Sequence, residues 1–201
     1  MELIRAKIIN IDGIACLKAL GEETGFKVGD RLTFEMKNGE KVEALAVKQE
    51  ADGMIFYFVD CLENEHRMNK ENTTEGDWKG SELYEYLNSR VINLFPDDIR
   101  GAMIPFADGE LLTIPGQKEI FGRVIFGADE GEYPEEQWEP MKLRRNRIAF
   151  QGLNGDPEWY WLRDPVSGAS FAYVSDAGHC NCGGASLAYI GVRPAFKIRN
   201  L

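Results

Sequence analysis

The sequence has little of what acyl-transfer catalysis requires, because its 201 residues include two histidines and four cysteines. A serine or cysteine triad needs a base, and His66 and His179 are the two choices. His66 lies in the charged run 63–70 and is expected to be a solvated surface residue. A P-loop and a Gly-x-Gly-x-x-Gly motif are also missing. We therefore predict no catalytic residue, no cofactor and no enzymatic activity.

Long hydrophobic runs are missing too. No segment approaches the roughly 18 apolar residues of a transmembrane helix, and residues 1–14 carry four charged side chains, unlike a signal peptide. Acidic residues (33) outnumber basic ones (23), for a formal net charge of -10. Such a surface repels phosphate groups, so we expect neither general nucleic-acid binding nor membrane binding. The one dense basic run, 142–147, is interpreted as a solvated helix face.

Cysteine is too sparse for a disulfide framework. Cys180 and Cys182 are one residue apart, and a bridge across that gap would be strained. The run from His179 to Cys182 holds three potential metal ligands, but no second pair stands at metal-finger spacing. We favour reduced, structural or incidental thiols, as in a cytoplasmic protein, and predict no metal site.

What the sequence does contain is a strand-rich first half. Residues 3–11 are apolar and β-branched, and residues 32–36 alternate apolar with polar side chains. Asn38-Gly39 separates that run from a second alternating run, which predicts a β-hairpin because both residues tolerate positive φ. Residues 54–59 are nearly all apolar, which is typical of a strand covered on both faces.

One helix is well marked after the strands. Ser81 is placed to cap it, and an apolar stripe at helical spacing runs from Leu83 to Leu94. Pro96 is expected at the first position of a following short turn. Residues 128–140 are acidic with two prolines and are expected to form an exposed excursion. This order of elements predicts an α+β fold.

Four further motifs occur in a fixed order. They are Val28-Gly29-Asp30, the segment from Trp78 to Asn88, the segment from Trp159 to Pro165, and the closing Gly191-Val192-Arg193-Pro194-Ala195. In this order they resemble an uncharacterised domain family common in bacterial and phage proteins. The closing motif is also similar to the last strand of the formylglycine-generating-enzyme fold, which diversified retroelement variable proteins share. This sequence departs from the family's usual pattern at Asp164, where most members have serine.

The resemblance implies a C-type-lectin-like scaffold for residues 71–201. Together with the hairpin predicted at Asn38-Gly39, this favours one domain spanning 1–201, with residues 1–70 as its β-hairpin-rich N-terminal part. The resemblance also implies a cytoplasmic or virion-associated protein. Residues Trp159 and Trp161 fall on one side of a strand, opposite Tyr160 and Leu162, as core residues would. The arginines are suited to binding loop carbonyls or a carboxylate such as Asp164. Five residues are thus assigned structural roles: Trp78, Trp159, Trp161, Arg163 and Arg193.

The stretch 175–186 is polar and rich in glycine, and is expected to be a loop between core strands, where binding sites are often found. Four residues of this region are the candidate ligand contacts: Asp176, His179, Asn181 and Tyr189. We predict a non-enzymatic recognition module for a protein or glycan ligand. A metal-dependent oxidase that uses Cys180 and Cys182, and a structural component of a phage or mobile-element particle, are the alternatives.

Overall fold

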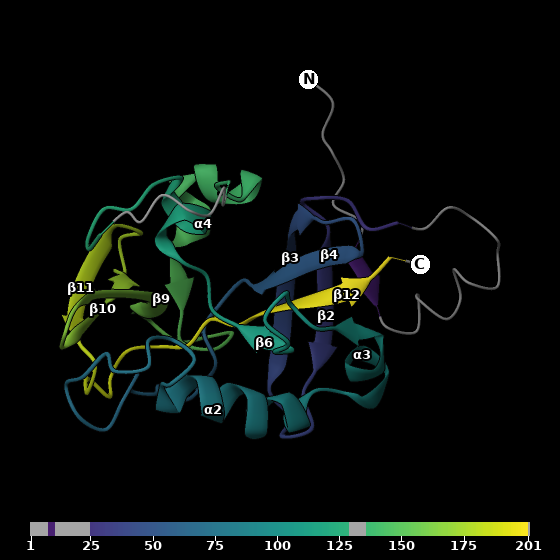
Figure 1. The fold of residues 1–201 in the computed structure, drawn as a ribbon. Coiled ribbons are helices and arrows are strands. Elements are labelled where there is room, and N and C mark those ends of the chain that lie inside the picture. The colour runs from purple at the N-terminus through teal and green to yellow at the C-terminus, as the bar shows by residue number, and fades with distance from the viewer. Residues whose placement is uncertain (1–7, 11–24, 129–135, 201) are drawn as a thin grey trace.

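A computed structural model describes residues 8–10, 25–128 and 136–200 of the chain, and its elements are mostly strands with a few short helices (Figure 1). The first strand, β1 (Ile8–Asn10), falls inside the strand predicted for residues 3–11. The remaining residues of that predicted strand lie outside the described residues.

The predicted hairpin is confirmed. β2 (Arg31–Glu35) and β3 (Lys41–Gln49) pair antiparallel, with Glu35 opposite Lys41. Gly39 in the connecting turn has a φ of 90°, which a residue without Cβ adopts readily. β4 (Gly53–Phe58) follows, and all of its residues are buried, as the apolar run predicted.

The last described strand of the chain lies inside the main sheet and is paired on both of its sides. In this seven-stranded sheet, β12 (Ala195–Arg199) pairs antiparallel with β4 on one side (Figure 1). On its other side it pairs with the short strands β5 (Met103–Ile104) and β6 (Leu112–Thr113). The strand pairing of this sheet is therefore complete only when the C-terminal residues have paired with β4, β5 and β6.

A second, three-stranded antiparallel sheet has the order β11-β10-β9, formed by β9 (Tyr160–Ser167), β10 (Ser170–Val174) and β11 (Cys180–Gly184). The sequence predicted a loop over 175–186, and this is wrong for β11. Its asparagine and glycines have low strand propensity, but pairing with β10 along its whole length overrides that preference. A two-stranded pair is formed by β7 (Ala149–Phe150) and β8 (Pro157–Glu158).

The predicted helix is confirmed as α2 (Glu82–Ser89), and a 3-10 helix, η1 (Val91–Leu94), continues its apolar stripe. The Ser81 hydroxyl accepts a hydrogen bond from the Tyr84 backbone N–H at 3.1 Å, so the predicted cap is present. Pro96 does not take the first helical position. Its ψ of 146° is extended, and it directly precedes α3 (Asp97–Ala102).

Three further helices lie on the side of the molecule opposite to α2. They are α4 (Gln117–Phe121) and two 3-10 helices, η2 (Glu139–Lys142) and η3 (Arg144–Arg147). The predicted exposed excursion is wrong at its C-terminal end, because Trp138 is 2% exposed and packs edge-on against Tyr57. The prediction relied on the acidic residues around Trp138, which gave no sign that its indole packs in the core. Residues 129–135 of that prediction lie outside the described residues.

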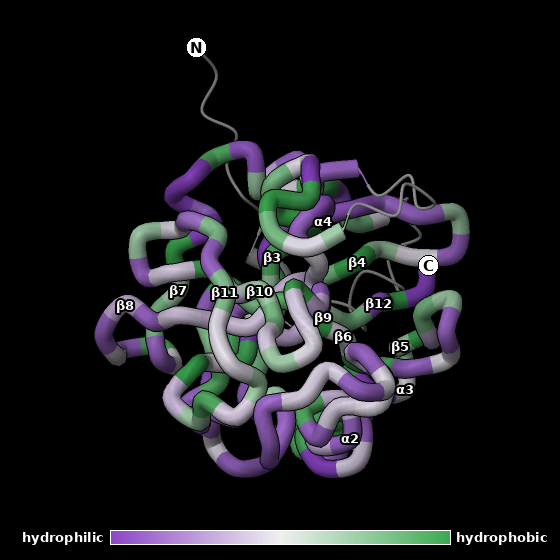
Figure 2. Tube along the Cα trace, turned by 60° about the vertical axis from the view of Figure 1, so that its left-hand side comes forward, coloured by the Kyte–Doolittle hydropathy of each residue, from purple (hydrophilic) through white to green (hydrophobic). Residues whose placement is uncertain are grey.

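The strands bury two hydrophobic clusters, one on each side. In β4, Phe56 belongs to the cluster under α2, whereas Tyr57 belongs to the cluster under α4 and η2. β9 alternates in the same way, with Trp161 in the first cluster and Tyr160 and Leu162 in the second, as its sequence predicted. Hydrophobic segments lie towards the interior, and the outer loops are mostly hydrophilic (Figure 2).

Gly191 lies where the two sheets meet, in close contact with β9. A Cβ at this position would lie 2.7 Å from Glu158 Cγ, 2.8 Å from Cys61 Sγ and 2.9 Å from the Trp159 carbonyl oxygen. Gly191→Ala should therefore lower the free energy of unfolding by about 1–3 kcal/mol through overpacking. Urea denaturation of the purified variant measures this.

Gly101 in α3 provides the matched control, because a Cβ there meets no atom within 4 Å. Gly101→Ala should leave stability unchanged or raise it by up to about 1 kcal/mol, the helix preference for alanine over glycine. Equal effects of the two substitutions would show that the close approach at Gly191 does not constrain the fold.

Candidate binding site

The Trp159–Pro165 and Gly191–Ala195 motifs lie side by side. The Gly191 N–H donates to the Trp159 carbonyl at 2.7 Å, and the Trp161 N–H donates to the Gly191 carbonyl at 3.2 Å. The N–H of Phe58, at the end of β4, donates to the Pro194 carbonyl at 3.0 Å. These bonds bring three of the five predicted structural residues, Trp159, Trp161 and Arg193, into one region.

Arg193 is 1% exposed and makes hydrogen bonds to three separate segments. Its Nε donates to the Phe58 carbonyl at 2.6 Å, and its Nη1 donates to the Asn146 carbonyl at 3.1 Å and the Tyr160 hydroxyl at 3.2 Å. The guanidinium carbon lies 4.1 Å from the centre of the Tyr57 ring. Backbone carbonyls, as expected for this arginine, and an aromatic face that was not expected surround this charge.

Arg163 lies at the edge of the second sheet, where it forms an ion pair with Glu119 of α4 and donates to the Ile114 carbonyl at 3.1 Å. The neighbouring Asp164 carboxylate accepts a hydrogen bond from the Gln117 N–H at 2.7 Å. Both side chains of this pair therefore hold the start of α4 against β9.

Two tryptophans are buried beside α2. Trp78 is 6% exposed and meets the ring of Tyr84 edge-on at 5.5 Å. Trp161 is fully buried, and its Nε1 donates to the His66 carbonyl at 2.8 Å. His66 was expected to be solvated, but its ring is half-buried and stacks on Tyr86 at 4.3 Å. The charged run around His66 in the sequence gave no sign of this aromatic partner.

An aromatic column reaches the surface from the second sheet. The rings of Trp159 and Tyr173 are stacked with centroids 5.2 Å apart, and the Tyr189 ring lies 6.3 Å from Trp159. Tyr173 is 5% exposed, whereas Tyr189 is 54% exposed. The column thus ends in an open aromatic face, and an exposed aromatic of this kind is typical of binding surfaces.

Carboxylates border the aromatic column. Burial raises the pKa of Glu158, and the nearby charges of Glu65 and Asp176 raise it further. Burial also raises the pKa of Tyr173, and the charge of Asp176 contributes to that increase. We call the group formed by Glu158, Trp159, Tyr173, Asp176 and Tyr189 the aromatic–acidic patch.

The structure brings some of the predicted ligand residues together at this patch. Asp176 and Tyr189 belong to it, and Asn181 is the cross-strand partner of Tyr173, so the two side chains point to the same side of the sheet. His179 is exposed at the end of the β10–β11 turn, where its backbone bonds to Ser175. Sequence reasoning missed Tyr173 and Glu158 as members of the site, although alternation along β10 was a signal for Tyr173.

Cys180 and Cys182 both lie on β11 and are free thiols. The Cys180 thiol contacts Gln117 Oε1 at 3.4 Å, and burial raises its pKa to about 12. Burial of Cys180 therefore disfavours the thiolate form, which is the nucleophilic form of cysteine. Within the described residues, no group of three His, Cys, Asp or Glu side chains is arranged to hold a metal ion.

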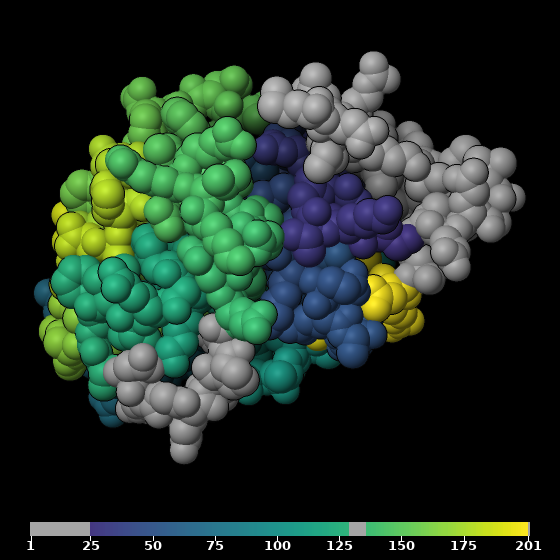
Figure 3. Space-filling view, turned by 90° about the horizontal axis from the view of Figure 1, so that it is seen from above, coloured from purple at the N-terminus to yellow at the C-terminus, as the bar shows by residue number. Residues whose placement is uncertain are grey.

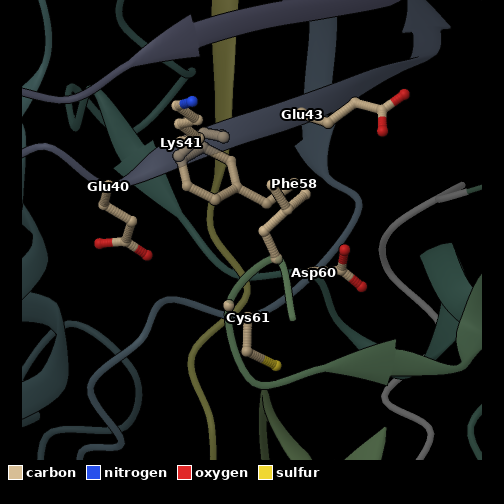
Figure 4. A pocket seen from close by; sticks show the side chains of 9 residues that line it. Glu40, Lys41, Glu43, Phe58, Asp60 and Cys61 are labelled. Atoms are coloured by element: carbon tan, nitrogen blue, oxygen red, sulfur yellow. The ribbon is translucent and has the colours of Figure 1, made fainter. Parts of the chain in front are cut away.

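A small pocket lies between the start of β3 and the end of β4 (Figure 4). Its volume of about 10 Å³ is close to the space of one water molecule. Burial raises the pKa of both Glu40 and Asp60, which line it. Each carboxylate accepts a backbone hydrogen bond, Glu40 from Glu63 at 2.8 Å and Asp60 from Phe150 at 3.1 Å. These acids hold loops in place, and the pocket is too small for a substrate.

Comparison with known families matches residues 52–200, from β4 to the end of β12, to the family described as Domain of unknown function (DUF6273). The chain belongs to this DUF6273 family. No curated protein and no solved structure matches the chain. The DUF6273 region contains the aromatic–acidic patch, Arg193 and both cysteines of β11. Among the described residues, no helix of this DUF6273 protein is long and apolar enough to cross a bilayer.

Trp161 and Tyr189 offer a direct comparison of a buried and an exposed aromatic. Trp161→Ala should lower the free energy of unfolding by about 3–5 kcal/mol, because it empties a closed site and leaves the His66 carbonyl without its donor. Tyr189→Ala should change stability by less than about 0.5 kcal/mol. Thermal melts of both variants measure the difference, and a stable Trp161→Ala variant would refute a structural role for this indole.

The pKa of Cys180 predicts slow alkylation. At pH 8, roughly one Cys180 side chain in ten thousand should be thiolate when its pKa is about 12. Iodoacetamide should therefore modify Cys180 far more slowly in the folded protein than in guanidinium, with a folded-state rate that increases as pH rises. Tandem mass spectrometry resolves the two cysteines. Fast native modification, together with stoichiometric copper or zinc, would support the oxidase alternative.

Proposed function

We propose that this protein is a non-enzymatic recognition module whose aromatic–acidic patch binds a cationic side chain, lysine or arginine, of a partner protein. The observation that carries the proposal is the exposed ring of Tyr189, which lies 6.3 Å from the ring of Trp159, next to Glu158, a carboxylate near enough to Asp176 for the two charges to interact. Tyr173 lies on β10, whose backbone is paired on both sides with β9 and β11, whereas the other members of the patch come from the segments next to this sheet. The paired strands hold the Tyr173 ring, on which Trp159 stacks, in place before a ligand binds.

The chemistry of the patch favours a positive charge. An aromatic face attracts a cation through its quadrupole, and carboxylates beside the ring add charge complementarity. A bound cation would also relieve the repulsion among Glu65, Glu158 and Asp176, which raises the pKa of Glu158. The overall charge of -10 steers cationic partners towards the protein.

The finer features of the sequence resemblance belong to this proposal. A C-type-lectin-like scaffold for residues 71–201 would place the binding surface on the β10–β11 hairpin and the segment after it. An association with phage or mobile elements, in the cytoplasm or in a virion, fits a small recognition module. A glycan could also stack on Tyr189, but an uncharged sugar would not account for the three neighbouring carboxylates.

The proposal is tested with an array of lysine- and arginine-containing peptides, each printed beside its counterpart with acetylated lysine or citrulline. The protein should bind a subset of the charged peptides and none of the neutral counterparts. Tyr189→Ala and Asp176→Asn should each lower the affinity for a selected peptide about tenfold, since a partly desolvated cation–π contact contributes on the order of 1–2 kcal/mol.

His179→Ala serves as the control variant, because this exposed side chain lies on the neighbouring turn and outside the patch. It should bind the same peptide with wild-type affinity. Equal binding by all three variants would show that another surface carries recognition. Selective binding on a glycan array, without any peptide binding, would replace the cationic ligand with a sugar.

A further inference from the structure

A second surface lies on another face of the molecule. A cleft of about 910 Å³ runs between the β2–β3 side of the main sheet and the η2–η3 segment. Figure 3 views this face, with residues 25–50 in purple to blue and η2–η3 in green. The volume is within the range of sites for small organic ligands.

Three large apolar side chains line the cleft while remaining open to solvent. Val28 is 42% exposed, Leu143 is 50% exposed and Phe150 is 40% exposed. They come from the segment just before β2, from the residue between η2 and η3, and from β7. Apolar groups gathered from three separate segments around one cleft are typical of a ligand site, whereas scattered exposed apolar residues are not.

The cleft is richer in positive charge than the protein as a whole. Arg31 and Lys142 line it and are neutralised by ion pairs with Glu43 and Glu139. Arg145 lines the rim, is exposed, and forms no ion pair with any residue that the structure describes. An unneutralised cation at the mouth of a cleft attracts anions, even in a protein whose net charge is -10.

The floor of the cleft contains Arg193. Its Nε and Nη1 are used in bonds to Phe58, Asn146 and Tyr160. Its Nη2 has no hydrogen-bond acceptor among the described residues, and no described carboxylate lies within ion-pair distance of the guanidinium. A guanidinium that is 1% exposed and keeps unused N–H donors at a cleft is suited to an oxyanion.

Among the residues that the structure describes, Asp60 and Glu139 are the two carboxylates that line the cleft. Asp60 accepts the Phe150 N–H at 3.1 Å, and Glu139 is paired with Lys142 at the exposed rim. Arg145 at the rim and Arg193 at the floor are therefore the lining cations that form no ion pair within the described part of the chain. The fixed bonds of Arg193 hold its guanidinium in place, so a ligand would meet a preorganised donor.

We propose that this cleft binds a small organic anion, with its oxyanion group at Arg193 Nη2 and its apolar body against Leu143, Val28 and Phe150. The ligand class is a carboxylate, sulfonate or phosphate attached to an aromatic or aliphatic group. This site is independent of the proposed function, because it lies on a different surface and selects the opposite charge.

The first experiment uses two probes with the same ring system. 8-Anilinonaphthalene-1-sulfonate carries an anionic group, and N-phenyl-1-naphthylamine lacks it. The folded protein should bind the sulfonate at one site, at least about tenfold more tightly than the neutral probe, given the strength of charge-assisted hydrogen bonds. Fluorescence titration gives both affinities, and a folded-state melt in each titration mixture excludes binding to unfolded chains.

Variants locate the site without disturbing Arg193. Arg145→Glu should lower the affinity for the sulfonate about tenfold and leave the affinity for the neutral probe unchanged, because the substitution reverses only the charge at the rim. Leu143→Ser should weaken both probes. Arg90→Glu makes the same charge reversal at the end of α2 and should weaken neither. In NMR spectra, the Nε–H signal of Arg193 should shift when the sulfonate binds.

Equal affinity for the two probes, or equal effects of Arg145→Glu and Arg90→Glu on sulfonate binding, would overturn the proposal. An unchanged Arg193 signal at saturation would overturn the assignment of the oxyanion to this residue. Either result would leave the peptide measurements at the aromatic–acidic patch unaffected, so the two proposals fail separately.

Discussion

The guanidinium of Arg193 joins parts of the chain that are far apart in the sequence. It bonds to the end of β4, to η3 and to Tyr160 of β9, and it lies on the ring of Tyr57. A buried charge is costly unless hydrogen bonds and polarisable groups replace its water. The two sheets must therefore come together with these carbonyls and rings in place, because any other arrangement would leave this charge uncompensated.

The surrounding motif follows from that requirement. Gly191 permits the close approach to β9, and the backbone of residues 191–194 continues the hydrogen bonding towards β4. β12 then enters the main sheet between β4 and the short strands β5 and β6. The closing Gly-Val-Arg-Pro-Ala segment of this DUF6273 protein is thus a junction between the sheets, and its spacing matters because each residue has a different partner.

The same junction places two surfaces of opposite character on one scaffold. On one side, Glu158 at the end of β8 and Trp159 just before β9 belong to the aromatic–acidic patch. On the other side, Arg193 forms the floor of a cleft whose rim carries Arg145. Because the charges of the two surfaces are opposite, the ligand proposed for one would be repelled from the other.

Local sequence determined the features whose energetics are local. Asn38-Gly39 specified the first hairpin, Ser81 the start of α2, and the alternation from Trp159 to Leu162 the two faces of β9, because each depends on neighbours within a few residues. Of the candidate ligand residues, the sequence indicated Asp176 and Tyr189, but not the column of Trp159 and Tyr173 that supports Tyr189. Tertiary structure alone decided that Cys180–Gly184 is a strand, that Trp138 is buried, and that β12 lies inside the main sheet. These features are stabilised by strand pairing and burial against segments that are distant in the chain. A local sequence pattern does not show which distant segment a residue will contact.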